Sequence, residues 1–499
     1  MRTFSKSKLL ALRQCPKRLW LEVHRPDLRE YSQETDSRVQ AGFQVGEIAR
    51  RIYDQDRQGV LIDVQADGFD RVFERTAELL HTRQPIFEAR FSAGGALTFA
   101  DILLPEQTGA ELVWHMIEVK SSTSVKNYHY DDLAIQAFAV KAAGIPLASI
   151  ALAYIDSSWV YPGNNDYCGL LKENDLTAET LSRTDEVNEW IVQAQSIVVQ
   201  PTEPAIATGN QCFSPFECSF YSYCSRNEPK PEYPVVWLPR FPSAKVEKLA
   251  AQGIDDLRNV PDELLNDQQR RVKTHTRANT VYFYAAGAAS DLTAYPLPAY
   301  FLDFETIQFA VPVWKGTRPY QQMVFQFSLH RLDALGQLEH TGFLDLSGSD
   351  PSESFAQSLI AACGGKGPVF VYNAGFELAR IRELAERFPS LSQPLLAIND
   401  RIVDLLPVAR KRYYHPSQQG SWSIKKVLPA VVPELRYDTL DGVQDGGMAM
   451  DAFLEGIHPD TSPERKTQIE QQLLAYCKLD TYAMVRLWQV FSGRADLKL

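Results

Sequence analysis

The sequence predicts a multi-domain α/β protein, and three observations support this prediction. The chain has 499 residues, of which 45% are hydrophobic and 23% are charged, so it contains enough apolar residues for several cores. Patterns typical of strands alternate with patterns typical of helices in its first and last parts. Between these parts, the segment EPKPEYPVVWLPRFP is dense in proline, which disfavours helices and sheet interiors and indicates a linker.

These observations predict four segments. A first α/β block covers 1–228, a linker 229–242, a helical segment 243–295 and a last α/β block 296–499. In the last block, AYFLDFETI and QMVFQFSLHRL are predicted strands, and one long helix is expected from about Glu464 to Phe491. Its strands come early and its helices late, which is typical of an α/β domain with a mixed sheet.

Charge and hydropathy exclude two classes of protein. The formal net charge of −11 argues against indiscriminate binding of nucleic acid by the whole surface. No run of roughly 18 apolar residues occurs, so a membrane span is not expected. The apolar run near the N-terminus is short and is interrupted by Arg13, which does not fit a signal peptide. We therefore expect a cytoplasmic protein.

One local stretch, 401–426, combines basic and aromatic residues. Such a mixture suits contacts with phosphates and stacking on bases, although a charged run is also typical of a solvated face. The candidates for contact with nucleic acid in this stretch are Arg410, Lys411, Arg412, Tyr414 and Trp422.

Four of the seven cysteines form a candidate metal site. Cys212, Cys218 and Cys224 are evenly spaced in CFSPFECSFYSYC, and Cys15 lies far upstream. Seven cysteines are too few for a disulfide scaffold of this length. Four thiolates fit either an iron–sulfur cluster or a structural zinc ion.

The last block carries a set of carboxylates. Asp303 and Glu305 are two residues apart on an apolar strand, so their side chains leave one face of the sheet. If this pair of carboxylates is buried, it requires a counter-charge such as a metal ion, because unpaired buried anions are costly. The alternative is an exposed strand end, where both carboxylates are solvated.

Two later motifs extend this set. Glu377 begins a predicted helix after the strand that ends at Asn373, and Tyr476 and Asp480 share one helix face because they are four residues apart. Asp303, Glu305, Glu377 and Asp480 would form a site of four carboxylates. Oxygen ligands of this kind suit two Mg2+ or Mn2+ ions, a pair that promotes phosphodiester hydrolysis.

The segments DFET, NAGFE and YCKLD, in this order, resemble the three motifs of DnaQ-like (DEDD-type, RNase H-fold) 3′–5′ exonucleases. The resemblance covers about 200 residues and implies an RNase H-like domain. It also implies that Tyr476 helps to position the attacking water. The sequence departs from the pattern at Glu377, where the family carries aspartate.

The first block contains a second candidate site. Two predicted strands joined by a polar turn carry Asp101 on the first and Glu118 and Lys120 on the second. Two carboxylates can hold a metal ion, and a nearby lysine can help to deprotonate the attacking water. A helix that follows carries Gln136, a further candidate for contact with nucleic acid.

This order of residues resembles PD-(D/E)xK nucleases of the RecB type. One cysteine before the nuclease core and three after it resembles the iron–sulfur members of that family, which implies a [4Fe–4S] cluster on Cys15, Cys212, Cys218 and Cys224, with zinc as the alternative. The sequence departs from the family in two ways. Only Glu47 stands near the place of an upstream metal-binding histidine, and the Q-x3-Y pair reads Gln136 and Val140.

The helical segment 243–295 resembles a helix-hairpin-helix, although a plain helical connector fits it as well. The whole chain resembles RecB-family nucleases in which an iron–sulfur PD-(D/E)xK domain is fused to an RNase H-like domain. This resemblance implies a metal-dependent nuclease that acts on nucleic acid, with DNA favoured over RNA. The alternative is a nucleic-acid-binding or scaffold protein in which one or both nuclease sites are degenerate.

Overall fold

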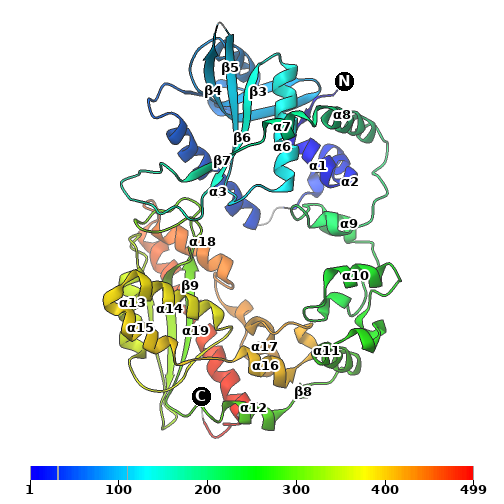
Figure 1. Cartoon of the computed structure of the whole chain (residues 1–499). Coiled ribbons are helices and arrows are strands. Elements are labelled where there is room, and N and C mark those ends of the chain that lie inside the picture. The colour runs from blue at the N-terminus through cyan, green and yellow to red at the C-terminus, as the bar shows by residue number, and fades with distance from the viewer. Residues whose placement is uncertain (1, 31–32, 110, 498–499) are drawn as a thin grey trace. The chain divides into compact units, whose positions relative to one another are not determined.

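The computed structural model describes residues 2–30, 33–109 and 111–497 and is a multi-domain α/β protein with mixed sheets (Figure 1). The chain divides into two compact units. The first unit consists of Met1–Glu228 together with Phe309–Gln321, and the second consists of Pro229–Gln308 together with Gln322–Leu499. Among the described residues, no helix is both long enough and apolar enough to cross a membrane.

The first unit is built on one mixed sheet. Its strands are β1 (Phe4–Ser5), β2 (Val60–Leu61), β3 (Ile86–Ala93), β4 (Ala96–Thr108), β5 (Glu111–Lys120), β6 (Leu147–Ile155) and β7 (Leu171–Asp175). The order is β2-β3-β4-β5-β6-β7, and β1 pairs with β4. The pairs β3–β4, β4–β5 and β6–β7 are antiparallel, whereas β5–β6 is parallel. The two strands predicted around Asp101 and Glu118 are therefore confirmed as β4 and β5.

Helices cover both faces of this sheet. The helices of the first unit are α1 (Lys6–Gln14), α2 (Pro16–His24), α3 (Gln33–Tyr53), α4 (Val64–Asp67), α5 (Arg71–Leu79), α6 (Asn127–Ala142), α7 (Thr177–Leu181), α8 (Thr184–Val198) and α9 (Tyr221–Ser225). Residues of α1, α6 and α8 share a large core with one face of the strands (Figure 1). Ala49 of α3 packs against Ile102 and Ile117 on the other face.

The second unit has a five-stranded mixed sheet. Its strands are β9 (Ala299–Ile307), β10 (Met323–Leu332), β11 (Leu338–Leu344), β12 (Val369–Val371) and β13 (Ile402–Asp404), and β8 (Tyr282–Phe283) pairs separately with β14 (Tyr413–Tyr414). The order is β11-β10-β9-β12-β13, so β9 is the central strand. The neighbours of β9 are antiparallel β10 and parallel β12.

The two faces of β9 have different environments. The helices of this unit are α10 (Ser243–Ala250), α11 (Asp267–Ala278), α12 (Ala285–Leu292), α13 (Ser352–Cys363), α14 (Gly375–Arg387), α15 (Ser392–Asn399), α16 (Leu406–Arg412), α17 (Ile424–Val431), α18 (Gly446–Ile457) and α19 (Pro463–Ser492). Leu302 and Phe304 pack into a core with α13, α14 and α15. The intervening residues of β9 leave the opposite face, where α19 packs on β9 and β10 (Figure 1).

The predicted boundary of the last helix agrees with the structure, whereas the predicted linker does not. The last long helix is confirmed, since α19 extends one residue beyond the predicted range at each end. The helical segment 243–295 and the proline-dense segment 229–242 both belong to the second unit. The proline-dense segment packs into that unit, because Val235 and Leu238 are buried. Its apolar residues between the prolines explain why it does not behave as an exposed linker.

Gly420 offers a test of this packing. Its φ is +74°, and a Cβ atom built on it would lie 1.6 Å from the carbonyl oxygen of Trp237 in the proline-dense segment. We expect Gly420→Ala to lower the free energy of unfolding by about 2–4 kcal/mol, because it combines a strained backbone with a clash against main chain. Urea denaturation of the full chain measures this change.

Gly493 is the matched control. It has the same φ of +74°, but no atom lies within 4 Å of the position of its Cβ. Gly493→Ala should therefore cost only the backbone penalty, about 1 kcal/mol. Equal losses in the two variants would show that the contact between Gly420 and Trp237 contributes nothing to stability.

Candidate functional site

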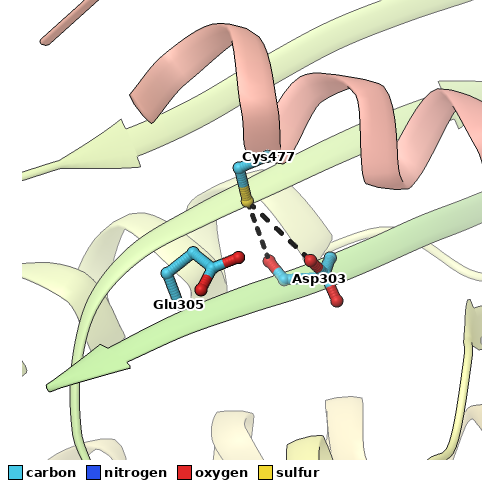
Figure 2. Close-up of side chains that lie close together, drawn as sticks. All are labelled: Asp303, Glu305 and Cys477. Carbon is cyan, nitrogen blue, oxygen red and sulfur yellow. Dashed lines mark hydrogen bonds between the residues drawn. The ribbon is translucent and has the colours of Figure 1, made fainter. Parts of the chain in front are cut away.

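The carboxylates of β9 meet on the face that α19 covers. Asp303 is half-buried and Glu305 is buried, and both face Cys477 of α19 (Figure 2). One ligand atom from each of these three residues lies within 4.8 Å of the others. The prediction that Asp303 and Glu305 share one face is thus confirmed, and its reason is the period of two along the strand.

Cys477 contributes little charge to this group. Its Sγ lies 3.9 Å from the carbonyl oxygen of Asp303 and 4.0 Å from Oδ2 of the same residue, as weak donor contacts. Burial, with Asp303 and Glu305 nearby, raises the pKa of the thiol well above its usual range. A neutral thiol is a poor ligand for a hard cation, so the oxygen atoms are the ligands that this group offers.

Glu377 and Asp480 add two further carboxylates. Glu377 lies in the first turn of α14 and Asp480 in the middle of α19, and each is almost completely buried. Oε2 of Glu377 and Oδ2 of Asp480 have no hydrogen-bond partner. Burial raises the pKa of Asp303, with further contributions from Asp480, Glu305 and Glu377, although only Asp303 and Glu305 of these acids lie within ligand distance of each other among the described residues. Buried and unpartnered carboxylate oxygens normally require a counter-charge.

Two tyrosines and a lysine surround Asp480. The hydroxyl of Tyr437 donates a hydrogen bond of 2.6 Å to Oδ1 of Asp480. Tyr476, four residues before Asp480 on α19, also lowers the pKa of that carboxyl by hydrogen bonding. Nζ of Lys425 lies 5.4 Å from the ring centre of Tyr437 and 5.3 Å from that of Tyr476. Sequence reasoning missed Lys425 and Tyr437, which lie between the recognised motifs.

Burial dominates the electrostatics of this group. Burial, with Asp480 nearby, raises the pKa of Glu305 to about 8, although Lys425 opposes the shift. Burial also raises the pKa of Glu377 to about 8, with a contribution from Asp404 at the end of β13. The pKa of Asp480 rises less, to about 6. Without a bound cation, Glu305 and Glu377 therefore hold protons near neutral pH, whereas Asp480 is mostly ionised.

Asp404 is a further acid that the sequence did not indicate. Its Oδ1 accepts hydrogen bonds of 2.9 Å from the backbone N–H groups of Asn373 and Leu406. Asn373 has a φ of +78° immediately before α14. Asp404 therefore holds the turn that leads into the helix of Glu377, and its role is to position that helix.

In the first unit, Glu118 and Lys120 lie in a cluster of ion pairs. Nζ of Lys6, from α1, lies 2.9 Å from Oε1 of Glu118 and 2.9 Å from Oδ1 of Asp132 on α6. Nζ of Lys120 contacts the same two carboxylates. Each lysine thus bridges both acids. Lys6 and Asp132 were missed by sequence reasoning, because only the packing of α1 and α6 on the sheet brings them to β5.

The remaining predicted residues of this site have different environments. Oδ2 of Asp101 accepts a hydrogen bond of 2.7 Å from the backbone N–H of Val119, and burial raises the pKa of Asp101. Gln136 is completely buried and donates to Asp132, so it positions this acid and does not present a surface to nucleic acid. Glu47 is exposed and pairs with Arg51 of its own helix.

An open pocket lies beside this sheet. It has a volume of about 790 Å3, and its lining includes Arg50, Arg51 and Arg57 together with Phe87 of β3. Burial raises the pKa of Glu88, the next residue on β3, and Arg50 opposes this shift. The lining also includes Glu47 and Asp54, and Glu47 pairs with Arg51, so the pocket is rich in arginine but mixed in charge.

The four predicted cysteines line one cavity of the first unit. Cys15 lies between α1 and α2, and Cys212, Cys218 and Cys224 come from the segment around α9. Leu21 and Phe220 form apolar walls, and burial raises the pKa of the Cys224 thiol to about 11. Lys17 and Arg18 also line the cavity. Four thiols and two cationic side chains thus line the same small cavity.

The basic–aromatic stretch does not form the predicted surface. Tyr414 and Trp422 are buried; the Tyr414 hydroxyl hydrogen-bonds that of Thr276, and Trp422 donates to a backbone carbonyl. Their rings therefore cannot stack on bases. Arg412 forms an ion pair with Asp291, whereas Lys411 is exposed and Arg410 is half-buried. The two aromatic side chains instead form part of the core around β14. The sequence pattern alone does not distinguish aromatic residues of a core from those of a stacking surface.

Comparison with known families matches the second unit in part. A family model described as a domain of unknown function (DUF2779) matches residues 300–423. The matched part includes Asp303, Glu305 and Glu377 and ends before Tyr476 and Asp480. A search of curated proteins finds no match.

The raised pKa values predict how pH affects stability. In buffer without divalent ions, we expect the free energy of unfolding to fall as the pH rises from about 4.5 to about 8. Glu305 and Glu377 titrate near 8 in the folded state and near 4.5 when unfolded, so the folded state holds protons that the unfolded state has released. Each group lowers stability by up to about 1.4 kcal/mol per pH unit in this window.

Thermal melts at pH 5.5 and pH 8 measure this effect. Adding Mg2+ should raise the melting temperature more at pH 8, where the cation replaces the lost protons, and Glu305→Gln should weaken the pH dependence. Asp460→Asn is the control, because Asp460 is exposed and its charge is screened by solvent. A melting temperature that rises between pH 5.5 and pH 8 without metal would contradict the prediction.

Proposed function

We propose that the chain is a divalent-metal-dependent nuclease, with 3′–5′ exonuclease activity in its second unit. The observation that carries this proposal is the set of carboxylates Asp303, Glu305, Glu377 and Asp480, three of which are buried and two of which have unpartnered oxygens. Mg2+ or Mn2+ offsets such a group with the hard charge that carboxylates prefer. The mixed sheet, with the first acidic pair on its central strand, is compatible with an RNase H-like domain.

The residues of the site have distinct roles in this proposal. Asp303, Glu305 and Asp480 hold the metal ions, which act as Lewis acids toward a phosphodiester group when bound. The hydroxyl of Tyr476 orients the attacking water, and Lys425 offers a positive charge beside Asp480. Glu377 is one methylene longer than the aspartate of related sites, and its unpartnered Oε2 is available as a ligand.

The first unit would hold a second, PD-(D/E)xK-like site. Asp101 and Glu118 offer carboxylates, and Lys120 lies in direct contact with Glu118. The pocket of Arg50, Arg51 and Arg57 supports nucleic acid as the substrate, because guanidinium groups bind phosphates without reading sequence. We favour DNA over RNA on the resemblance to RecB-type nucleases alone.

The cysteine cavity would hold a [4Fe–4S] cluster, with zinc as the alternative. Cys15, Cys212, Cys218 and Cys224 supply four thiolates, and the apolar wall of Leu21 and Phe220 excludes water. A bound metal centre would tie the first turns of the chain to residues about two hundred positions later, so its binding energy would contribute to folding.

A second candidate function applies to the first unit. Lys6 and Lys120 pair with both Glu118 and Asp132, and such pairing can replace a metal ion as the counter-charge. This observation favours a unit that binds nucleic acid through its arginines without cleaving it. The two candidates differ in whether Lys120→Ala removes any cleavage.

Removal of one carboxylate tests the exonuclease. Asp303→Asn should slow Mg2+-dependent degradation of single-stranded DNA from its 3′ end by roughly 10³-fold or more. The variant removes a ligand of the metal ions, which lower the energy of the charged transition state by several kcal/mol. Gel analysis of 5′-labelled DNA follows the shortening, and 3′-labelled DNA and RNA test polarity and substrate. Asp460→Asn should leave the rate unchanged.

A double variant assigns any residual cleavage. If Asp303→Asn retains some activity and the additional change Lys120→Ala removes it, the first unit is a second nuclease. If the wild-type chain binds nucleic acid but cleaves neither DNA nor RNA with Mg2+ or Mn2+, the binding or scaffold function replaces the nuclease.

The cysteine centre has an independent signature. Protein purified without oxygen should be brown, with broad absorbance near ~400 nm and bound iron and sulfide. Cys15→Ser should remove the colour and lower the melting temperature, because metal binding contributes to folding. Cys168→Ser is the matched control, since Cys168 is exposed and lies outside the cavity. Colourless protein with one zinc ion per chain would contradict the iron cluster.

A further inference from the structure

The segment between α17 and α18 lies against the carboxylates of the second unit, although it holds none of the recognised motifs. Within this segment, the hydroxyl of Tyr437 donates a hydrogen bond of 2.6 Å to Oδ1 of Asp480. At its end, where α18 begins, a Cβ atom built on Gly446 would lie 4.0 Å from Oε2 of Glu305. The segment therefore reaches two of the proposed metal ligands.

The hydrogen bond from Tyr437 to Asp480 is shielded from water. The side chain of Tyr437 is buried, and so is that of Asp480. A hydrogen bond between buried groups is stronger than one in water, because the local dielectric constant is low. A carboxylate that is held at one oxygen cannot rotate freely. Tyr437 thus fixes the orientation of Asp480.

The two oxygens of Asp480 have different environments. Oδ1 accepts the hydrogen bond from Tyr437, whereas Oδ2 is buried and has no hydrogen-bond partner among the described residues. Asp480 shares a face of α19 with Cys477, three residues earlier, and Sγ of Cys477 lies within 4.8 Å of ligand atoms of Asp303 and Glu305. Because Oδ1 is occupied, Oδ2 is the oxygen that remains for a cation.

Lys425 holds the ring of Tyr437 in place. Its Nζ donates a hydrogen bond of 3.0 Å to the backbone carbonyl oxygen of Gln444, at the other end of the segment. The same Nζ lies 5.4 Å from the ring centre of Tyr437 and 5.3 Å from that of Tyr476. A cation at this distance is attracted to an aromatic ring. The lysine therefore connects both ends of the segment with the two tyrosines of the site.

We propose that Tyr437 is a positioning residue of the second unit, whose hydroxyl holds Oδ1 of Asp480 and thereby presents Oδ2 to Mg2+ or Mn2+. A group that hydrogen-bonds to a metal-binding side chain orients it, and its loss weakens metal binding. The inference rests on the proposed metal-dependent function, and it adds a residue that lies outside the three motifs. It also separates the two tyrosines, since Tyr437 acts on a ligand and Tyr476 on the attacking water.

The test removes one hydroxyl and measures Mn2+ binding to the full-length chain by electron paramagnetic resonance. Binding that Asp303→Asn with Glu305→Gln abolishes is assigned to the second unit. Tyr437→Phe keeps the ring beside Lys425 and should weaken this binding roughly tenfold or more. Because Oδ2 of Asp480 is still present, saturating Mn2+ should restore most of the 3′–5′ degradation rate. A rate that stays low at saturating Mn2+ would overturn the positioning role, because the hydroxyl would then act in the chemical step.

Tyr413→Phe is the matched control. Tyr413 is also buried in the second unit, and its hydroxyl donates a hydrogen bond of 2.7 Å to the carbonyl oxygen of Ala430. This variant should lower the melting temperature about as much as Tyr437→Phe but leave the Mn2+ affinity unchanged. An equal loss of Mn2+ affinity in both variants would show a general effect of packing and would overturn the role of Tyr437.

Two further outcomes separate this inference from the proposed function. Unchanged Mn2+ affinity in Tyr437→Phe, with a loss in Asp480→Asn, would overturn the role of Tyr437 and leave the metal site intact. If Asp303→Asn with Glu305→Gln removes no Mn2+ from the wild-type complement, the second unit has no metal site, and the proposed function fails together with the inference.

Discussion

Like charges buried side by side are the constraint on which both candidate sites depend. A carboxylate removed from water needs a proton, a cation or a set of donors, because its desolvation is otherwise too costly. In the second unit, burial raises the pKa values of Asp303, Glu305 and Glu377, neighbouring carboxylates raise them further, and Lys425 opposes the shift at Glu305. In the first unit, Lys6 and Lys120 supply counter-charges directly. The carboxylates of the second unit are thus accommodated mainly through raised pKa values, and those of the first unit mainly through ion pairs with lysines.

The cores of the two sheets hold these charges in place. Leu302 and Phe304 are packed against α13–α15, and this anchoring directs Asp303 and Glu305 to the opposite face. The helix α19 packs on that face (Figure 1), and its Asp480 raises the pKa values of Asp303 and Glu305 further beyond the effect of burial. The acids cannot move apart to relieve their repulsion without disrupting apolar contacts. Packing of the core therefore keeps the carboxylates close together, whereas on a flexible segment they would move apart.

In the first unit, one short helix connects two features. Lys6 begins α1 and contacts Glu118 and Asp132, and Cys15 follows the last residue of the same helix and lines the cysteine cavity. A helix of nine residues is nearly rigid over this length. Loss of order at the cysteine cavity would therefore reach the ion pairs of the acidic cluster through α1.

The sequence by itself determined the features that depend on local periodicity. The period of a strand placed Asp303 and Glu305 on one face, and the period of a helix placed Tyr476 and Asp480 on one side of α19. The strands of Asp101 and Glu118, and the long last helix, followed from the same patterns. These features need only neighbouring residues, because backbone geometry repeats over a few positions.

Only the tertiary structure decided which distant residues meet. Lys6 and Asp132 reach Glu118 through the packing of two helices on one sheet. Tyr437 reaches Asp480 from a segment with no motif of its own. The burial of Tyr414 and Trp422, which the sequence placed at a nucleic-acid surface, depends on the neighbours of β14. Residue types specify which contacts are favourable, but burial and strand irregularities, such as the left-handed backbone at Glu88, arise from the sum of all contacts in the folded chain.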